Sequence, residues 1–193
     1  MPHLAQTSVP ILPVLAERWS PRAFESSPPL TPADLIPAFE AARWSPSANN
    51  NQPWRFIVGF MGDEVHDIIS ANLAGWNNAW MPLAPVLVAT IAQTTLASGN
   101  PNPYALYDLG QSVAYFSVQA QSDGLYVHQV AGTNTAALQE AFNPPAGFEF
   151  FHTFAVGRLG NPDDLPEELA ERERAPRERL PVEDIVRYSP FDS

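Results

Sequence analysis

Pro46-Ser-Ala-Asn-Asn-Asn-Gln-Pro-Trp54 is the most unusual stretch of this chain, because three asparagines and a glutamine follow one another in it. Asparagine-rich stretches are most often turns, since asparagine tolerates a left-handed backbone. A plain turn needs only one or two such residues, however, and a run of amides is costly to bury unless something satisfies its donors and acceptors. The alternative is a loop that binds a heterocyclic ligand rich in carbonyl groups and ring nitrogens.

The residues on either side of this loop predict a helix and a strand. Thr31-Pro-Ala-Asp34 is typical of a helix start, with an N-cap, a first-turn proline and an acid near the positive end of the helix dipole. Apolar residues then recur at helical spacing to about Trp44. After the loop, residues 54–60 are aromatic and β-branched and predict a short strand.

The rest of the chain predicts an α+β fold with few strands and long helices. Residues 86–91 form a continuous apolar run, as in a strand covered on both faces. Residues 104–122 predict the longest helix, whose apolar residues go nearly all the way round it. Such a helix is usually buried in a core or in a subunit interface. A shorter helix is expected at 135–142 and a last strand at 150–156.

Composition narrows the class of protein. The 193 residues, 45% of them hydrophobic, suit one compact domain. All 10 basic residues are arginine against 21 acids, and the net charge of −11 argues against binding to nucleic acid or anionic membranes. The absence of cysteine excludes disulfides and thiolate chemistry. The longest apolar run, residues 81–91, is too short for a membrane span, so a cytoplasmic protein is expected.

Common catalytic motifs are missing from the sequence. The glycines form neither G-x-G-x-x-G nor a P-loop, and there is no G-x-S-x-G. The four histidines are scattered, so the sequence supports no metal site. After residue 160 the composition changes: residues 161–193 hold 10 of the 21 acids and 5 of the 10 arginines. This tail could not hold a core of its own, and we expect it to be disordered or an extended arm lying on something else.

A second notable segment is Arg18-Trp-Ser-Pro-Arg22. In an extended backbone Arg18, Ser20 and Arg22 point to one side. Two guanidinium groups and a hydroxyl on one face make a good receptor for a phosphate. The alternative is a solvated pair of arginines near a helix end, which would contribute little.

Taken together, these segments resemble the nitroreductase family of FMN-dependent enzymes. Arg18-x-Ser-x-Arg22 followed by Pro46-Ser-x-x-Asn-x-Gln-Pro-Trp54 is similar to the opening signature of that family. Three later segments also match in the right order: Asn77 shortly before Ala84-Pro85, the run from Gly124 to Gly132, and Arg177-Glu-Arg179-Leu-Pro181.

The resemblance implies an α+β nitroreductase-like fold with a central, mostly antiparallel sheet flanked by helices, in an intertwined homodimer with FMN at two interface sites. Residues 1–160 would form the FMN-binding core. Residues 161–193, the C-terminal arm, would belong to the same domain and pack on the partner subunit. The helix at 104–122 would lie centrally in the interface, the alternative being an ordinary core helix of a monomer.

The resemblance also implies roles for individual residues. The flavin phosphate and ribityl chain would be met by Arg18, Ser20, Arg22, Arg177 and Arg179, and the isoalloxazine ring by Pro46, Ser47, Asn50 and Gln52. Asn77 would meet the pyrimidine edge of the ring, and Gln129, Val130, Ala131 and Gly132 would pass along its other side. No side chain is expected to act as a catalytic acid, base or nucleophile, since the cofactor carries the chemistry.

The implied reaction is a ping-pong transfer of hydride from NADH or NADPH through FMN to a nitroaromatic, a quinone or a similar acceptor. The chain departs from the enterobacterial oxygen-insensitive enzymes at Ala131, where they carry Glu, and at Trp80, where they carry Lys. A different subgroup with an altered flavin potential is therefore expected. Trp76 and Trp80 either line the acceptor pocket or pack the dimer, and His128 lies near the site or is structural.

Three alternative functions remain open from the sequence. One is a family relative that uses the flavin for a different oxidation. The second is a non-enzymatic protein that stores or senses FMN, and the third is an acidic, helix-rich binding domain without a cofactor, which would make all these matches coincidental.

Overall fold

Strand β3 (Val86–Gln93) lies at the centre of the sheet in the computed structural model of this chain, which describes residues 3–189. It pairs antiparallel with β2 (Trp54–Phe60) on one side and with β5 (Phe148–Leu159) on the other. The far side of β5 pairs with β4 (Tyr126–Val130) and, at its end, with the short β1 (Phe24–Glu25). The predicted strands are confirmed, although β5 is longer than expected.

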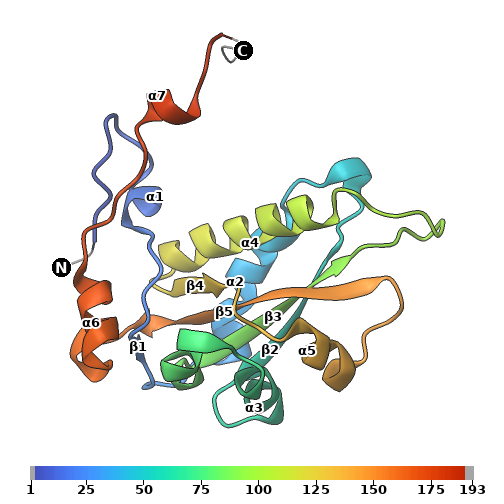
Figure 1. Cartoon of the computed structure of the whole chain (residues 1–193), viewed down its shortest axis with the longest axis horizontal. Helices are drawn as coiled ribbons and strands as arrows, with labels where there is room; N and C mark the ends of the chain where they lie inside the picture. Colours follow the sequence, from blue (N-terminus) through green and yellow to red (C-terminus); the bar gives the residue numbers. More distant parts are fainter. Residues whose placement is uncertain (1–2, 190–193) are drawn as a thin grey trace.

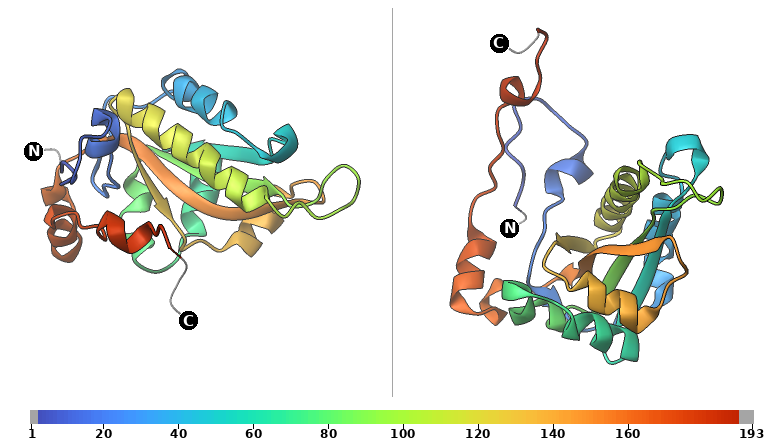
Figure 2. Two further views of the ribbon diagram at one scale, coloured as in Figure 1. Left: turned by 90° about the horizontal axis from the view of Figure 1, so that it is seen from above. Right: turned by 45° about the vertical axis from the view of Figure 1, so that its right-hand side comes forward.

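Helices cover both faces of this sheet, as Figures 1 and 2 show. Because side chains alternate along a strand, Val86 and Val88 point to one face and Leu87 and Ala89 to the other. The first face packs against α2 (Pro32–Arg43) and α4 (Ala105–Ser122), and the second against α3 (Glu64–Ala71) and α5 (Thr135–Phe142). The nitroreductase-like arrangement of an antiparallel sheet between helices is thus present.

Local sequence explains the helix boundaries. Thr31 and Asp34 form a reciprocal capping box at the start of α2, where the sequence predicts the helix to begin. Asp63 caps α3 by accepting a hydrogen bond from the His66 N–H at 2.7 Å. This helix was not predicted from the sequence. Four short 3₁₀ turns complete the body: Ala48–Asn50, Gly75–Ala79, Met81–Leu83 and Pro162–Asp164.

The two ends of the chain run side by side and stand away from the sheet (Figures 1 and 2). The N-terminal segment contains α1 (Pro13–Glu17), and the C-terminal arm contains α6 (Glu167–Arg174) and α7 (Val182–Ile185). The expectation of a disordered or extended tail was therefore incomplete, because α6 buries Leu169, Ala170 and Glu173 against the body. Residues 1–2 and 190–193 lie outside the described part of the chain.

Helix α4 is buried on one side only. Leu109, Val113 and Phe116 are completely buried in the core, whereas Tyr104, Tyr107 and Tyr115, at or on the helix, are exposed. The all-round apolar pattern therefore divides into a core face and a solvent face. Within residues 3–189, no helix is both long enough and apolar enough to cross a membrane.

Candidate functional site

The segment from Arg18 to Ala23 alternates between buried and half-buried residues, as an extended chain should. Trp19, Pro21 and Ala23 are buried, whereas Arg18, Ser20 and Arg22 are half-buried on the other side. The Arg18 Nη1 lies 3.4 Å from the Ser20 Oγ. The structure thus brings these three predicted residues onto one face.

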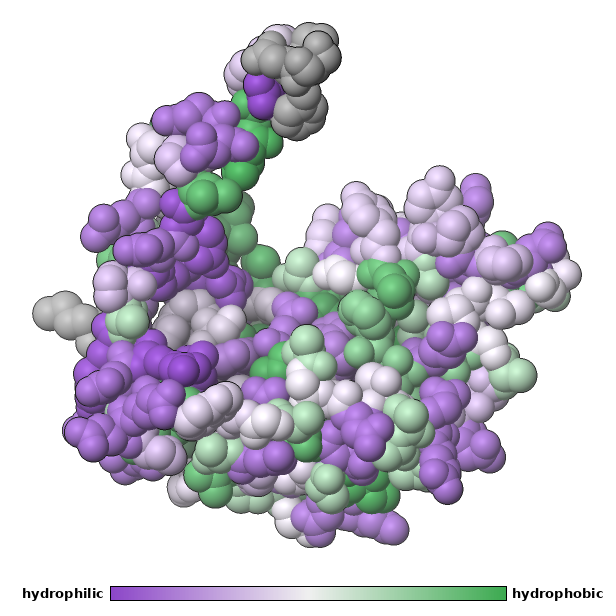
Figure 3. Space-filling view, viewed as in Figure 1, coloured by the Kyte–Doolittle hydropathy of each residue, from purple (hydrophilic) through white to green (hydrophobic). Residues whose placement is uncertain are grey.

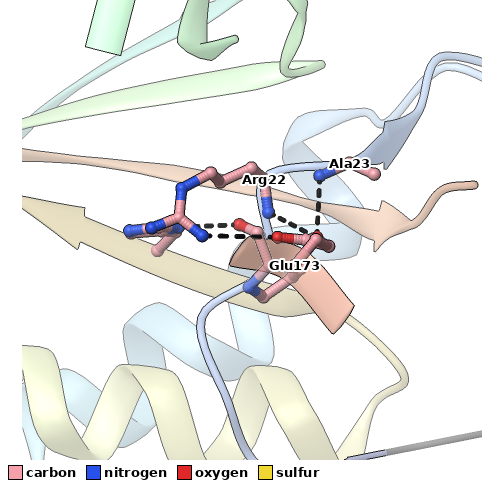
Figure 4. Close-up of polar contacts among 5 residues, drawn as sticks. Arg22, Ala23 and Glu173 are labelled. Atoms are coloured by element: carbon pink, nitrogen blue, oxygen red, sulfur yellow. Dashed lines mark hydrogen bonds and ion pairs between the residues drawn. The ribbon is translucent and has the colours of Figure 1, made fainter. Parts of the chain in front are cut away.

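A buried carboxylate from α6 lies against this segment (Figure 4). The Glu173 Oε1 accepts hydrogen bonds from the Arg22 N–H at 2.8 Å and the Ala23 N–H at 3.1 Å. Its Oε2 lies 3.5 Å from the Arg22 Nη1. The Glu173 side chain has no exposed surface, whereas that of Arg22 is 25% exposed. Glu173 therefore fixes the main chain here while the Arg22 guanidinium still reaches the surface.

Arg177 and Arg179 lie beside Arg18 of the same chain. The Arg177 guanidinium donates hydrogen bonds to the carbonyl oxygens of His3, Ala16 and Arg18, at 2.6 to 2.8 Å. Burial, together with the positive charges of Arg177 and Arg179, lowers the pKa of Arg18. Among the described residues no carboxylate forms an ion pair with any of these three arginines, so this corner carries uncompensated positive charge.

His128 on β4 holds the segment from its other side. Its Nδ1 lies 2.8 Å from the Pro21 carbonyl oxygen, and its ring packs on the buried Trp80 with centroids 4.5 Å apart. Burial lowers the pKa of His128 to about 4, which keeps the ring neutral, and nearby Arg22 and Arg18 act in the same direction. His128 and Trp80 are thus packing residues in this chain. Trp76 is exposed, with the Arg172 guanidinium 5.4 Å from its ring centroid.

Asn77 and Gly132 meet at the far end of β4. The Asn77 Nδ2 donates to the Gly132 carbonyl oxygen at 3.2 Å. A Cβ at Gly132 would lie 2.5 Å from that same Nδ2, so glycine is what permits the approach. Of the neighbouring predicted residues, Gln129 and Ala131 are exposed and Val130 is buried. Residues 128–132 therefore connect the Asn77 contact to the Arg18–Arg22 segment.

The loop at 46–52 has the unusual backbone that its sequence indicates. Asn49, Asn50 and Gln52 all have left-handed φ angles, of 52°, 55° and 47°. The Ser47 Oγ accepts a hydrogen bond from the Gln52 N–H at 3.1 Å, and Pro46 is exposed. Internal hydrogen bonds thus hold the loop in a conformation that is uncommon for residues other than glycine.

This loop lies away from the arginine segment. The Ala48 N–H donates to the Asp108 Oδ2 at 3.1 Å, which fixes the loop at the first turn of α4. Helix α4 has 18 residues and is therefore about 27 Å long. The Arg18–Arg22 segment lies near the other end of that helix, close to β4 (Figure 1). One chain thus carries two separate groups of the predicted residues.

A cleft of about 660 Å³ opens between the two terminal segments. Arg18, Arg177 and Arg179 line it together with apolar residues of both ends, such as Leu15 and Leu180. The arginine corner is therefore open to ligands. Elsewhere within residues 3–189, His, Asp and Glu side chains do not gather in threes as a metal site would require.

Two residues of the site were not anticipated from the sequence. Glu173 follows Leu169 and Ala170 at helical spacing, and this stripe in an otherwise charged helix was the available signal. Asp108 is a buried acid within the apolar helix at 104–122, and such a residue needs a partner. In the fold that partner is the Asn-rich loop.

Comparison with known proteins shows what this chain is similar to. The nitroreductase family model matches residues 15–73. An uncharacterized 15.4 kDa protein in the ask 5′ region of Mycolicibacterium smegmatis is 33% identical over 139 residues, which span 68% of this chain and 93% of that protein.

Solved structures extend the likeness over nearly the whole chain. A structure described as an oxidoreductase containing FMN is 32% identical, with a TM-score of 0.90 over 97% of this chain and 96% of its own. A putative nitroreductase in complex with FMN, from Exiguobacterium sibiricum 255-15, is 18% identical, and its TM-score of 0.75 over 96% of this chain and 100% of its own shows the shared fold. The resemblance seen in the sequence is confirmed: the chain belongs to the nitroreductase family.

Proposed function

We propose that this protein is an FMN-dependent oxidoreductase that takes electrons from NADH or NADPH and passes them to nitroaromatic, quinone or similar acceptors. The observation that carries the proposal is the corner of Arg18, Arg177 and Arg179 with the neighbouring Arg22. Within residues 3–189 only Arg22 of these four pairs with a carboxylate, in a chain with a net charge of −11. Such a corner calls for an anionic ligand. Family membership and the relative described as an oxidoreductase containing FMN support FMN as that ligand.

The donor set suits the phosphate end of FMN. Guanidinium groups and a hydroxyl donate charge-assisted hydrogen bonds to phosphate oxygens. Arg18, Ser20 and Arg22 share one face, and Arg18 also lines the cleft to which the exposed Arg179 belongs. Arg177 would contribute mainly through its charge, because its guanidinium already donates to three carbonyl groups.

The ring end of the cofactor would be bound by residues from two chains. Asn77 and residues 129–132 lie on the side of the arginine corner, whereas Ser47, Asn50 and Gln52 lie near the opposite end of α4. Because about 27 Å of helix intervenes, we propose that a homodimer completes each site, with the loop supplied by the partner subunit.

Exposed apolar surface supports this homodimer. Leu12, Leu180, Val182 and Ile185 on the terminal segments are exposed, as is Tyr107 on α4. Figure 3 shows apolar surface on the raised terminal segments and on the body across the open space beside them. Large exposed apolar surfaces are typical of interaction sites. The C-terminal arm is proposed to pack on the partner subunit over this surface.

The chain's own groups would bind and orient rather than react. FMN held by these residues would supply the hydride transfer between nicotinamide and acceptor, in two ping-pong half-reactions. No titratable side chain is needed for that transfer, and His128 is held neutral by burial. The open loop at 46–52 would set the access of donor and acceptor to the ring.

The experiment is an anaerobic titration followed by absorption spectroscopy. The purified protein, supplied with FMN, should show flavin bands that bleach on addition of NADH or NADPH and return with a nitroaromatic or a quinone. Flavin bands that persist under both nicotinamides would favour a storage or sensor protein. Failure to take up FMN at all would contradict the proposal.

A further inference from the structure

Glu173 is a buried acid that contacts Arg22 and Ala23, and the proposed chemistry assigns it no role. Its side chain is fully buried, and it comes from α6, about 150 residues away in sequence from the segment it contacts. Leaving such a charge in the interior is costly unless hydrogen bonds compensate it. Its hydrogen-bond partners therefore indicate what it does.

Those partners belong mainly to the main chain of the arginine segment. The Oε1 accepts from the N–H groups of both Arg22 and Ala23, at 2.8 and 3.1 Å, whereas the contact from Oε2 to the Arg22 guanidinium is longer, at 3.5 Å. The carboxylate is thus bound to the backbone (Figure 4), and the Arg22 side chain remains partly exposed. This arrangement directs the Arg22 side chain and leaves it available to a ligand.

The opposite side of the segment is held as well. His128 binds the Pro21 carbonyl and Arg177 binds the Arg18 carbonyl, so Glu173 completes a set of three side chains around residues 18–23. Of these three side chains, only Glu173 contacts the guanidinium of Arg22, which is proposed to bind the phosphate. Fixing a charged donor in advance reduces the ordering that binding would otherwise require.

We infer that Glu173 is a positioning residue for the phosphate subsite, acting through Arg22. This inference rests on the proposed function, because it takes the phosphate of FMN as the anion. It makes α6 a part of the cofactor site although the helix itself supplies no ligand to the cofactor. Its effect should fall on the phosphate of FMN and not on the ring.

The test compares FMN with riboflavin, which has the same ring and no phosphate. Their dissociation constants are measured by quenching of flavin fluorescence in wild type and in Glu173→Gln, which keeps the shape and weakens the charge-assisted bonds. We expect FMN affinity to fall about tenfold or more, with riboflavin affinity changed less than about twofold. Glu168→Gln, which removes the exposed ion pair with Arg172 on the same helix, is the matched control and should leave both affinities unchanged.

A double-mutant cycle distinguishes action through Arg22 from a general loosening. In an Arg22→Gln background, Glu173→Gln should weaken FMN binding by less than about twofold further. A full tenfold loss in that background, or equal losses for FMN and riboflavin, would overturn the inference. Unchanged or tighter FMN binding by Glu173→Gln alone would also overturn the inference, because the carboxylate would then only compete with the phosphate for Arg22.

Two further results keep the conclusions separate. Wild-type protein that binds no FMN would refute the proposed function itself, whereas wild-type binding with an unaffected Glu173→Gln variant would refute only the positioning role. If Glu173→Gln does not fold, Glu173→Asp is measured in its place. Asp keeps the charge but shortens the reach, so we expect the same selective loss for FMN at a smaller size, and an unaltered FMN-to-riboflavin ratio would overturn the inference.

Discussion

Lowering the pH from 7 to 5 is expected to destabilise the fold through His128 and His152. Burial lowers the pKa of each from about 6.5 to about 4. For His152, burial is the cause of the lowered pKa. Its Nδ1 lies 2.9 Å from the Thr90 Oγ1, and its Nε2 is buried with no hydrogen-bond partner in the described part of the chain. Both rings are therefore neutral in the folded protein at pH 5.

The sign follows from proton linkage. Below pH 6.5 the unfolded chain binds protons at these rings and the folded chain does not, so protonation favours unfolding. The stabilising contribution is complete above pH 6.5 and is lost as the pH falls toward 4. With the two pKa values 2.5 units apart, each ring contributes a loss of about 2 kcal/mol at pH 5, or about 4 kcal/mol together.

The assay is urea unfolding at pH 7 and pH 5 at one protein concentration, since the stability of the proposed homodimer would depend on concentration. His128→Gln keeps a donor for the Pro21 carbonyl and removes the titration. Its free energy of unfolding should fall about 2 kcal/mol less than that of wild type between the two pH values. Ile69→Val, a core change without a titrating group, should follow wild type. Parallel pH profiles for wild type and His128→Gln would refute the reasoning.

Three further predictions concern the core and the loop. Phe116→Ala, which empties a fully buried site on α4, should lower the free energy of unfolding by about 3–5 kcal/mol in urea titrations. Gly59→Ala would place a Cβ 2.3 Å from the main chain of α3, and a loss of about 3 kcal/mol or more is expected; a midpoint equal to wild type would contradict this contact. Asp108→Ala removes the acceptor of the Ala48 N–H, so stability should fall about 1–3 kcal/mol and limited proteolysis should begin within residues 46–52.

Much of the fold could be predicted because local signals and tertiary packing agree. The capping box at Thr31 and Asp34 marks the start of α2 within the chain itself, and residues 86–91 predict a buried strand from their continuous apolar character. Helix α5 and strand β2 have the predicted bounds. In each case the sequence pattern and the packed environment require the same structure.

Two of the elements that were missed, β1 and α6, depend on distant partners. Strand β1 has only two residues and exists because β5 lies beside it, and α6 is a highly charged helix stabilised by burying Leu169 and Ala170. Glu173 illustrates the same limit at the site. Nothing near it in sequence shows that its partners are the N–H groups of Arg22 and Ala23, about 150 residues earlier. The alternation of Arg18, Ser20 and Arg22, by contrast, is a local property and was predicted correctly.

The pairing of β1 with the end of β5, and of residues 22–23 with α6, also sets an order of events during synthesis. Residues 22–25 are synthesised well before their sheet partner on β5 and the buried Glu173 carboxylate, which follow more than 130 residues later. Closing so long a loop is slow compared with forming the α2–β2 region. The nascent chain can therefore begin to assemble its central sheet first, and the contacts of residues 22–23 with Glu173 form only when α6 has emerged.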